Sequence, residues 1–590
     1  MHAKTLIGWS ARLLLAVFFV TGTAWAQYNA SIQGTVTDPS GAAVAQAKVS
    51  FENLANNITG TTSTDASGFY RFLSLAPGSY KISVEATGFS SASITVTLET
   101  NQNLDVPIAV KVGTTSETVT VTAENPLINT AETRNQQTLQ TQELSTLPLA
   151  ARNMLSLSTI APGVTGLGLA GGPGVASGTP GANAGNFSTE EAVDVSANGQ
   201  GTVANMWIID GLDVTSSVRQ GVLNLTPNPD VIQESNNQVN TYTSEYGRGS
   251  GLQVAMTTKS GGDEFHGLVS DYFNYQSMYA KYSLPHAAQS FNPFHSNNLS
   301  GTVGGPIIPH HQFFFFFGIE ALRSSASTGN NTITFPAPEF AAFAQANNAG
   351  TFGTKILNTY VPTKVAGSSV AETADQYFGR VNPNDQNSPF ICAADPASIE
   401  NIPCSTPMLD SGTFNSANVI NGTQYFVRVD KYFSKDRIYG SFFRTLQANP
   451  APNVIAQFST TNNYWQRALQ VNWTHTFSPT TLNEAIFAQN RIEGKLGETG
   501  DFTIPGITVI GTAQNVGYGV GFAQGDFIQH NYHWRDVLTH VRGAHVIKVG
   551  YEGLYGDDVE PFQGPWSHPS FNFNSLLALA QDSPLNESGV

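Results

Sequence analysis

Charged side chains are scarce in this sequence, and it has no stretch long and apolar enough for a membrane-spanning helix. Asp, Glu, Lys and Arg together make up only 12% of the 590 residues, and the formal net charge is -16. Binding to nucleic acid needs clustered Lys and Arg that neutralise phosphates, so the absence of such a cluster argues against that class of partner. Because a spanning helix needs about 20 apolar residues, any residence in a membrane must use strands.

The sequence also lacks the local patterns of common catalytic and metal centres. No Ser/His/Asp or paired-carboxylate arrangement has a recognisable context, and zinc-ligand spacing such as H-E-x-x-H is missing from the N-terminal region. Several histidines form two groups, namely His310 and His311, and His530, His533, His540 and His545. At strand spacing, such histidines are more often lumen or girdle residues than metal ligands. The sequence therefore predicts no enzyme, no cofactor and no metal site.

One stretch, Gly166 to Gly171, satisfies the G-x-G-x-x-G pattern of dinucleotide-binding loops. That pattern has meaning only after a strand and before a helix that the loop opens. Here it lies in a Gly/Pro/Ala tract without helical periodicity. This context favours a flexible loop over a nucleotide site.

Glycine and aromatic residues, in contrast, are abundant. The chain has 55 Gly, 36 Phe and 19 Tyr, which together with the low charge favours β-rich structure outside the cytoplasm. A chain of 590 residues exceeds one ordinary hydrophobic core, so several domains are expected.

Residues 1–26 have the three parts of a secretory signal peptide. Lys4 and Arg12 form a basic start, Leu13 to Val20 an apolar core, and Ala24-Trp25-Ala26 an A-x-A site. Cleavage is therefore expected between Ala26 and Gln27. The alternative is a membrane anchor, which is disfavoured because an apolar run this short cannot cross a hydrocarbon core.

Residues 27–113 predict a small β-sandwich of about seven strands. The segment from Ser31 to Phe51 alternates apolar and polar residues, and turns are marked at Asp38 to Gly41 and at Pro77-Gly78. The pattern is similar to the carboxypeptidase regulatory-like domain, a transthyretin-like fold classed with starch-binding sandwiches. That resemblance implies no catalysis and, by analogy alone, indicates carbohydrate as a candidate ligand.

Residues 125–262 carry three motifs in order. They are LSTLPLAARNMLSLSTIAPGV (Leu144 to Val164), VSANGQGTVANMWIIDGLDV (Val195 to Val214) and NPDVIQESNNQVNTYTSEYGRGSG (Asn228 to Gly251). They resemble the plug domain of Oar-like TonB-dependent outer-membrane receptors, with Ala150-Ala151 where that family has Asn-Gly. Trp207 to Ile209 is expected to be a buried strand and Asp210-Gly211 its turn, within an α+β plug.

The predicted plug ends in a turn and a strand. Tyr246-Gly247, followed by Gly249 and Gly251, predicts a tight turn, since Gly accepts positive φ without steric cost. Leu252 to Lys259 then alternates apolar and polar residues, which predicts a strand that stops at Ser260-Gly261-Gly262. A "YG" turn before such a strand is similar to the end of the plug in the same receptors.

Residues 263–590 predict part of an antiparallel transmembrane β-barrel. Leu469 to Thr474 alternates apolar and polar residues, as in strands between lipid and a lumen. Phe426 to Thr445 has the pattern of a hairpin with a short periplasmic turn, and a long Asn- and Gly-rich insertion after Arg323 that of an extracellular loop. Further stretches resemble Oar-like receptors: Phe265 to Asn274, Leu299 to Ile308, Phe313 to Arg323 and Asp536 to Glu552.

The number of strands has a consequence for the length of the chain. Nine candidate strands lie between Phe265 and Tyr555, whereas plugged outer-membrane transporters have roughly 22. An open sheet in lipid leaves unpaired edges that cost several kcal/mol for each group. The expectation is therefore an N-terminal portion of a longer receptor.

The linker at residues 114–124 contains a strand-like run: Glu117, Thr118, Val119, Thr120, Val121, Thr122 and Ala123. Exposed polar and β-branched residues suit a strand that pairs with a partner's sheet edge. The resemblance to the receptors implies that this run is the TonB box, the segment that TonB pulls in the periplasm. The alternative is a last strand of the preceding sandwich, and the two interpretations are compatible.

The only two cysteines, Cys392 and Cys404, are near each other in the sequence. In an oxidising compartment such a pair predicts a disulfide, and closing so short a loop adds about 3 kcal/mol in the chain-entropy model. A metal site needs more ligands than this pair offers.

The resemblance as a whole implies a mainly β receptor in the Gram-negative outer membrane, with its sandwich in the periplasm. Its partners would be TonB with the inner-membrane energising complex, outer-membrane lipid, and a bulky substrate such as a siderophore, an oligosaccharide or a peptide. The substrate would bind to outer loops and plug, and TonB would then displace the plug. The alternative is an adhesion or surface-assembly protein of the same architecture without active transport, while a plain porin has no use for a plug.

Overall fold

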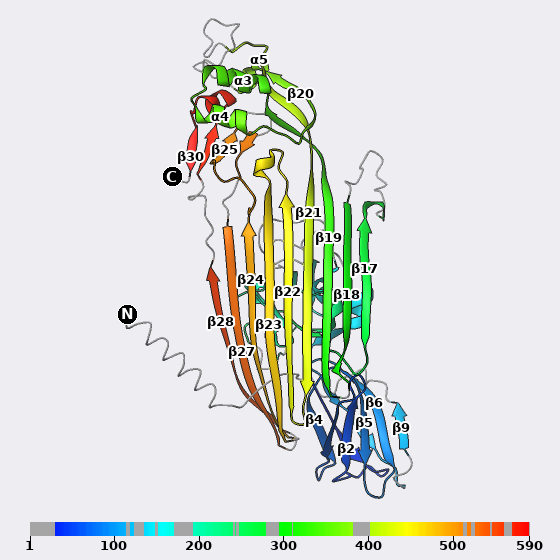
Figure 1. Ribbon diagram of the computed structural model, residues 1–590. Helices are drawn as coiled ribbons and strands as arrows, with labels where there is room; N and C mark the ends of the chain where they lie inside the picture. The colour runs from blue at the N-terminus through cyan, green and yellow to red at the C-terminus, as the bar shows by residue number, and fades with distance from the viewer. Residues whose placement is uncertain are drawn as a thin grey trace, which may run out of the picture.

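The computed structural model describes residues 30–113, 118–122, 135–147, 152–169, 193–239, 242, 247–278, 294–309, 311–381, 402–478, 480–510, 516–520, 525–542, 545–559 and 569–588. These residues are mainly in strands, and they form a small sandwich, a plug and a long curved sheet that follow one another along the chain (Figure 1). None of the helices in the described part has the length and apolar character needed to cross a bilayer.

The sandwich has two sheets around one core. The first contains β4 (Phe69–Leu75), β1 (Ala30–Thr37), β7 (Asn103–Asp105) and β8 (Ile108–Ala109). The second has the order β3 (Thr59–Ser63), β2 (Lys48–Asn53), β5 (Gly78–Glu85), β6 (Ser91–Leu98) and β9 (Thr118–Thr122). Alternate residues of β4 and β5 point inward, and Ile32, Tyr70 and Ile82 are among the buried core residues. The predicted transthyretin-like sandwich is confirmed.

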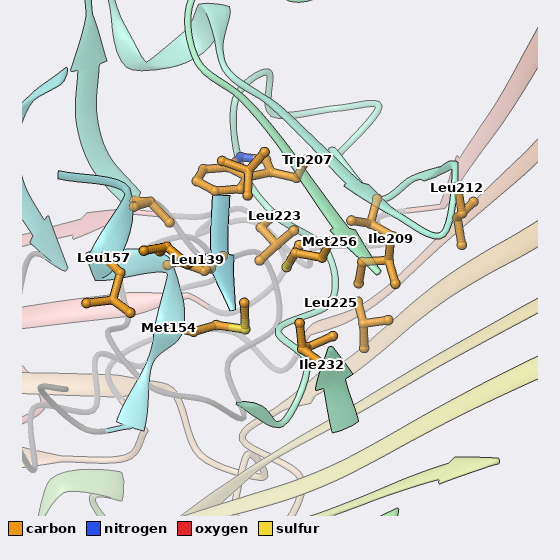
Figure 2. Packing of buried hydrophobic residues seen from close by; sticks show 14 of the residues in the cluster. Leu139, Met154, Leu157, Trp207, Ile209, Leu212, Leu223, Leu225, Ile232 and Met256 are labelled. Atoms are coloured by element: carbon orange, nitrogen blue, oxygen red, sulfur yellow. The ribbon is translucent and has the colours of Figure 1, made fainter. Parts of the chain in front are cut away.

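The plug is built on a mixed sheet whose strands come from distant parts of the sequence. Its order is β10 (Gln136–Gln140), β15 (Ile232–Gln238), β16 (Gln253–Thr258), β13 (Met206–Ile209) and β14 (Leu212–Asp213). Helix α2 (Thr141–Thr146), the 3-10 helices η2 (Met154–Ile160), η3 (Thr202–Ala204) and η4 (Pro229–Val231), and the β11–β12 hairpin surround it. Trp207 is fully buried in the core (Figure 2), and its indole N–H donates to the Gly221 carbonyl at 2.9 Å.

The long curved sheet is the barrel wall. Within the described residues, nine strands follow one another in one antiparallel path: β17 (His266–Tyr275), β18 (Phe294–Ile308), β19 (Phe313–Pro336), β21 (Pro407–Tyr432), β22 (Asp436–Ala451), β23 (Thr460–Ser478), β24 (Thr481–Leu496), β27 (Gly525–Arg542) and β28 (His545–Val559). That number equals the nine strands expected from the sequence. In the described part of the chain, β17 and β28 are the two edges of this path and do not pair with each other.

The two ends of the wall differ. At the end near the sandwich, a short turn joins β21 to β22 (Figure 1), as predicted for the hairpin from Phe426 to Thr445. At the other end lie α3 (Pro338–Asn347), α4 (Phe352–Thr359), β20 (Ala366–Thr373), α5 (Ala374–Val381), η6 (Ala456–Phe458), β25 (Gly506–Val509), β26 (Val516–Tyr518), β29 (Ser570–Phe573), α6 (Leu576–Ala580) and β30 (Asn586–Ser588). We call this group the outer cap. It has a hydrophobic core of its own, which includes Phe340, Tyr377 and Leu577.

Two expectations from the sequence were wrong in detail. The loop expected after Arg323 begins later, because β19 continues to Pro336 and stays paired with β21 as far as Leu409, with one register shift between Ser327 and Asn330. The β-branched residues Thr332 to Thr334 support this extension in spite of the Asn and Gly residues before them.

The second correction concerns the tract that was expected to be a flexible loop. Val164–Leu169 forms strand β11, which pairs with β12 (Val193–Ala197) through a register shift at Gly166. The Gly-rich composition of this stretch did not indicate a strand, and its main-chain pairing with β12 is what keeps it extended. The rest of the G-x-G-x-x-G stretch, from residue 170, lies outside the described residues.

Candidate functional site between plug and barrel wall

The predicted Asp210-Gly211 turn is the start of the site. It joins β13 to β14 as a two-residue hairpin, with Ile209 opposite Leu212. Both turn residues have positive φ, 48° at Asp210 and 84° at Gly211, as a type I′ hairpin turn requires. This geometry places the Asp210 side chain at the end of the plug sheet, facing the barrel wall.

Asp210 links the plug to the wall through its carboxylate and its carbonyl. The carboxylate accepts from the Thr258 N–H at 2.9 Å and the Thr258 hydroxyl at 2.5 Å, and it lies 3.3 Å from the Arg428 guanidinium of β21. Its carbonyl accepts from Gln470 at 2.5 Å and from the Tyr439 hydroxyl at 3.3 Å. Three wall strands thus bind one plug residue.

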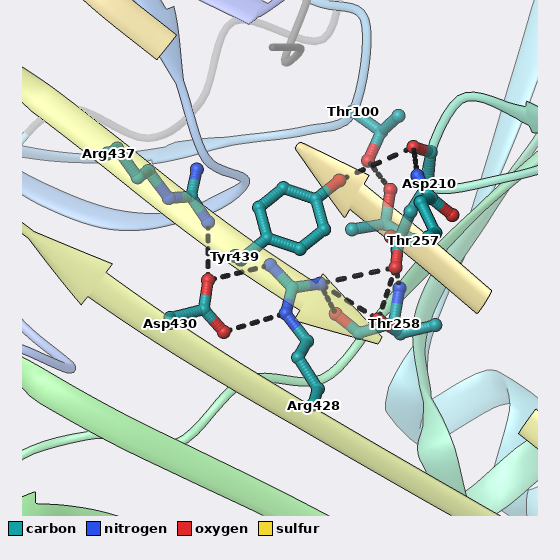
Figure 3. Close-up of polar contacts among 9 residues, drawn as sticks. Thr100, Asp210, Thr257, Thr258, Arg428, Asp430, Arg437 and Tyr439 are labelled. Carbon is teal, nitrogen blue, oxygen red and sulfur yellow. Dashed lines mark hydrogen bonds and ion pairs between the residues drawn. The ribbon is translucent and has the colours of Figure 1, made fainter. Parts of the chain in front are cut away.

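Arg428 is the centre of this contact (Figure 3). It is fully buried, pairs with Asp430 at 2.8 Å, and stacks over the Tyr439 ring at 4.2 Å. Arg437 reaches the other oxygen of Asp430 at 2.9 Å. Buried charges are tolerated only when they are paired and hydrogen-bonded. Here the pairing joins the plug, through Asp210, to the barrel wall, through Arg428. We call Asp210, Arg428, Asp430 and Arg437 the plug lock.

A second charged contact lies further along the same interface. Arg152, the residue after Ala151 in the first plug motif, lies 3.0 Å from Asp230 of the plug and 3.5 Å from Glu320 of β19. Its guanidinium also covers the Tyr272 ring at 3.8 Å. Each partner of the interface therefore contributes one arginine. Arg152 of the plug contacts Glu320 of the wall, and Arg428 of the wall contacts Asp210 of the plug.

The predicted turn at Tyr246-Gly247 differs from expectation in its backbone. Positive φ falls on Arg248, at 63°, and not on Gly247, Gly249 or Gly251. Gly249 is needed for close approach, because a Cβ there would lie 2.8 Å from the Met206 Cβ. Tyr246 itself lies outside the described residues.

Arg248, in that turn, forms an ion pair inside the plug. Its guanidinium lies 2.6 Å from Asp213, the last residue of β14. Burial raises the pKa of Asp213, and the Arg248 charge opposes that shift only in part. The pair therefore ties the turn to the hairpin that carries Asp210.

The sandwich contacts the plug at a second polar site. The Thr100 N–H donates to the Glu234 carboxyl, and the Thr100 and Thr257 hydroxyls are 2.8 Å apart. Burial raises the pKa of Glu234 to about 8, and the Glu99 charge adds to this effect. Glu234 is only 4% exposed, so the sandwich covers a carboxyl group that water would otherwise solvate.

The predicted TonB box is partly described. Thr118–Thr122 forms β9, which pairs in parallel with β6 from Ser91 to Thr95. Glu117 and Ala123 lie outside the described residues. The backbone thus adopts the alternative weighed from the sequence, a last strand of the sandwich, and the role as a TonB box stays a prediction.

Other predicted residues are distant from this interface. Cys404 is disulfide-bonded and packs against the core of the outer cap, but its predicted partner Cys392 lies outside the described residues, and so do Ala26 and Gln27. Among the described residues, no group of three or more His, Cys, Asp and Glu is close enough to hold a metal ion.

Sequence reasoning missed the plug lock and Glu234. Arg428 and Asp430 stand two residues apart in the FVRVDKYF strand, so period-2 alternation puts both on one face. Charges on an inward face of a barrel strand are a usable signal that something polar is bound there. Glu234, inside the third plug motif, carries no comparable signal.

Comparison with known proteins agrees with this architecture. Residues 257–586 match the family described as "Outer membrane beta barrel domain", and residues 31–111 match "Carboxypeptidase regulatory-like domain". The chain therefore belongs to the outer-membrane β-barrel family, and it is located in the outer membrane.

A curated relative and solved structures resemble this chain. The TonB-dependent transporter Oar of Myxococcus xanthus is 26% identical over 326 residues, which are 53% of this chain and 29% of Oar. The outer membrane transporter YddB from Escherichia coli is 10% identical, with a TM-score of 0.45 over 74% of this chain and 50% of YddB. Ferric citrate transporter FecA is also 10% identical, with a TM-score of 0.35 over 73% and 57%. The resemblance to Oar-like receptors is confirmed, although the chain spans less than a third of Oar.

Proposed function

We propose that this chain acts as a TonB-dependent outer-membrane transporter, which takes up a bulky substrate when TonB displaces the plug. The observation that carries the proposal is the plug lock, in which a buried arginine of the wall binds a carboxylate of the plug at 3.3 Å. Apolar side chains of the wall, among them Phe426 and Phe443, also pack against the plug core. A polar contact is geometrically specific, and its groups can exchange their partners for water when the plug moves.

The proposed mechanism has two steps. Substrate binds from outside to the outer cap and the plug, and TonB then engages the run from Glu117 to Ala123 in the periplasm. Because this run precedes β10 of the plug sheet, tension on it reaches the plug through residues 123–135. The Asp210 contacts then break, and a path opens along the polar face of the wall.

A proline in the predicted box tests this mechanism. Proline lacks the N–H that a main-chain ladder needs, so Val119→Pro or Val121→Pro is expected to abolish energy-dependent uptake while the protein still reaches the cell surface. Uptake is measured with a labelled panel of ferric siderophores, oligosaccharides and peptides. Lys111→Ala, an exposed substitution just before the linker, is the matched control and should leave uptake unchanged. Uptake that survives both prolines would show that the box is elsewhere.

A second candidate function is adhesion or surface assembly without transport. The outer cap favours it, because a folded group of helices and strands with its own core presents a stable surface to the exterior. This candidate predicts that cells bind a partner and that a protonophore does not change the binding. Transport predicts accumulation that the protonophore stops.

A further inference from the structure

A cavity of about 690 Å³ lies where the sandwich meets the rim of the barrel wall. On the sandwich side it is lined by residues of β2, β3, β4 and β5, and on the wall side by the β21–β22 turn and the adjoining ends of β23 and β24. In Figure 1, β4 lies next to the lower end of β21. Pockets of this size hold organic ligands, so the cavity has room for more than a single ion.

The lining of this cavity carries an excess of positive charge. The lining residues with charged side chains are Arg71, Lys435, Arg437 and Asp436. Arg437 is paired with Asp430 at 2.9 Å. Asp436 accepts hydrogen bonds from Trp473 at 2.6 Å and from His475 at 2.8 Å. Arg71 and Lys435 remain, and neither has an ion-pair partner within the described residues. In a chain whose net charge is -16, two such cations at one cavity favour an anionic ligand.

Arg71, on β4, is the more constrained of these two cations. Its Nε and Nη1 atoms are buried and have no hydrogen-bond acceptor in the described part of the chain. Its guanidinium lies 5.6 Å from the centre of the Phe69 ring, a contact that provides no oxygen acceptor. Burial lowers the pKa of Arg71, and the Asp105 charge opposes this shift. A half-buried cation with unmet donors is stabilised by an acceptor that the chain itself does not supply.

The position of the cavity indicates the source of that acceptor. Short turns such as β21–β22 are on the periplasmic side of a barrel. Phe433 and Phe477 line the cavity and are 53% and 45% exposed, as in the aromatic girdle of a barrel, whose rings lie at the level of the lipid head groups. On the sandwich side, the Phe51 ring packs 4.9 Å from Phe72 and 5.8 Å from Tyr80. Cations beside aromatic rings suit a ligand with a charged head and an apolar body.

We propose that this cavity binds the phosphate group of an anionic phospholipid from the periplasmic leaflet. The phosphate accepts hydrogen bonds from Arg71 of the sandwich and Lys435 of the wall, and the first part of the acyl chains packs against the aromatic rings. Because the two cations belong to different parts of the molecule, one bound lipid bridges the sandwich and the wall. This inference goes beyond transport, and it requires only that the wall lies in the outer membrane.

Cross-linking of a photoreactive lipid tests the site. The full-length chain in detergent is titrated with phosphatidylglycerol that carries a diazirine near its glycerol, and labelled peptides from β4 and the β21–β22 turn are quantified by mass spectrometry. Arg71→Gln and Lys435→Gln should each raise the half-saturating lipid concentration by about tenfold or more, since each removes a charge-assisted contact to the phosphate. Lys435 is exposed in a turn, so its substitution leaves the fold intact.

The matched control is Lys81→Gln, at an exposed lysine of the sandwich outside the cavity, which should change the half-saturating concentration by less than about twofold. If the unaltered chain is not labelled at these peptides, or if Lys435→Gln is labelled like the control, the inference is wrong.

Competitors separate the possible sources of the phosphate. Unlabelled phosphatidylglycerol should displace the probe, whereas inorganic phosphate and diacylglycerol at the same concentration should not. Displacement by inorganic phosphate would show a site for free anions and overturn the assignment to lipid. Displacement by diacylglycerol would show that acyl chains bind without the cations.

The bridge between the two parts has its own measurement. Hydrogen exchange of the amides in β4 and in the β21–β22 turn should slow when phosphatidylglycerol is added to the unaltered chain, and should not change in Lys435→Gln. Equal exchange of the unaltered chain with and without the lipid would contradict the bridge.

Discussion

Single buried charges decide how the plug is held. Arg428 has no exposed surface, and it neutralises two carboxylates, Asp210 of the plug and Asp430 of the wall. Breaking a buried ion pair by removing one partner costs more than the pair contributes when intact, because the remaining charge stays buried. The strength of the plug lock is therefore concentrated in one side chain.

Substitution of Arg428 tests this directly. We expect Arg428→Gln to destabilise the closed plug by about 3–5 kcal/mol, since Asp210 loses its ion-pair partner and Asp430 keeps only Arg437. The measurement is native-state hydrogen exchange of the β13–β14 amides, which reports local opening. Arg444→Gln, at an exposed arginine of the neighbouring strand β22, is the matched control, with an expected change below about 0.5 kcal/mol. Equal protection in the two variants would contradict the role of the plug lock.

Glu234 makes the contact between sandwich and plug depend on pH. Burial raises the pKa of Glu234 from 4.5 to about 8. Between pH 4.5 and pH 8, Glu234 is therefore protonated while the sandwich is docked on the plug, and it loses this proton when the sandwich separates. Stability of the contact therefore falls as pH rises from 4.5 towards 8, by up to about 1.4 kcal/mol per pH unit.

The expected result is that exchange of the amides near Thr100, corrected for intrinsic rates, accelerates relative to the rest of the sandwich over this pH range. In Glu234→Gln the side chain cannot ionise, and the pH dependence should disappear. The same dependence in the Gln variant would mean that another group controls the contact.

At the scale of elements, the sandwich is a cover on the plug as well as the carrier of β9. If the sandwich must leave before the plug moves, a bond between them should stop transport without preventing TonB from binding. Thr100 and Thr257 are suited to this, because their hydroxyls are 2.8 Å apart and they belong to the two bodies.

The oxidised Thr100→Cys/Thr257→Cys variant is therefore expected to bind the TonB periplasmic domain within about threefold of the reduced form and to show no uptake. Reductant should restore uptake, which distinguishes the bond from a folding defect. Each single cysteine variant is the control. Uptake by the fully oxidised variant would mean that the plug opens beneath a sandwich that stays in place.

At the scale of the whole molecule, the sequence motifs predicted the order of the parts well. Alternation in strands such as Leu469 to Thr474 is a local property, and the plug motifs are contiguous, so both can be recognised without three-dimensional information. The Asp210-Gly211 turn was predicted for the same reason, because its two residues specify their own backbone.

What was missed depends on residues that meet only after folding. Asp210 and Arg428 are separated by more than two hundred residues, so nothing near either one indicates the partner. The fold of the insertion after Pro336 was missed for a related reason. Its helices α3 and α4 pack against each other, and α4 packs against α6, which comes much later in the chain.

The outer cap also constrains how this protein can diversify. Surface loops that act separately tolerate substitution, insertion and deletion one at a time. Here segments from several separate connections share one core, so a change in one alters the packing of the others. Variation in α4 that a new ligand or an immune pressure favours must therefore be matched in α3 or α6, and the exterior of this protein should evolve as a unit.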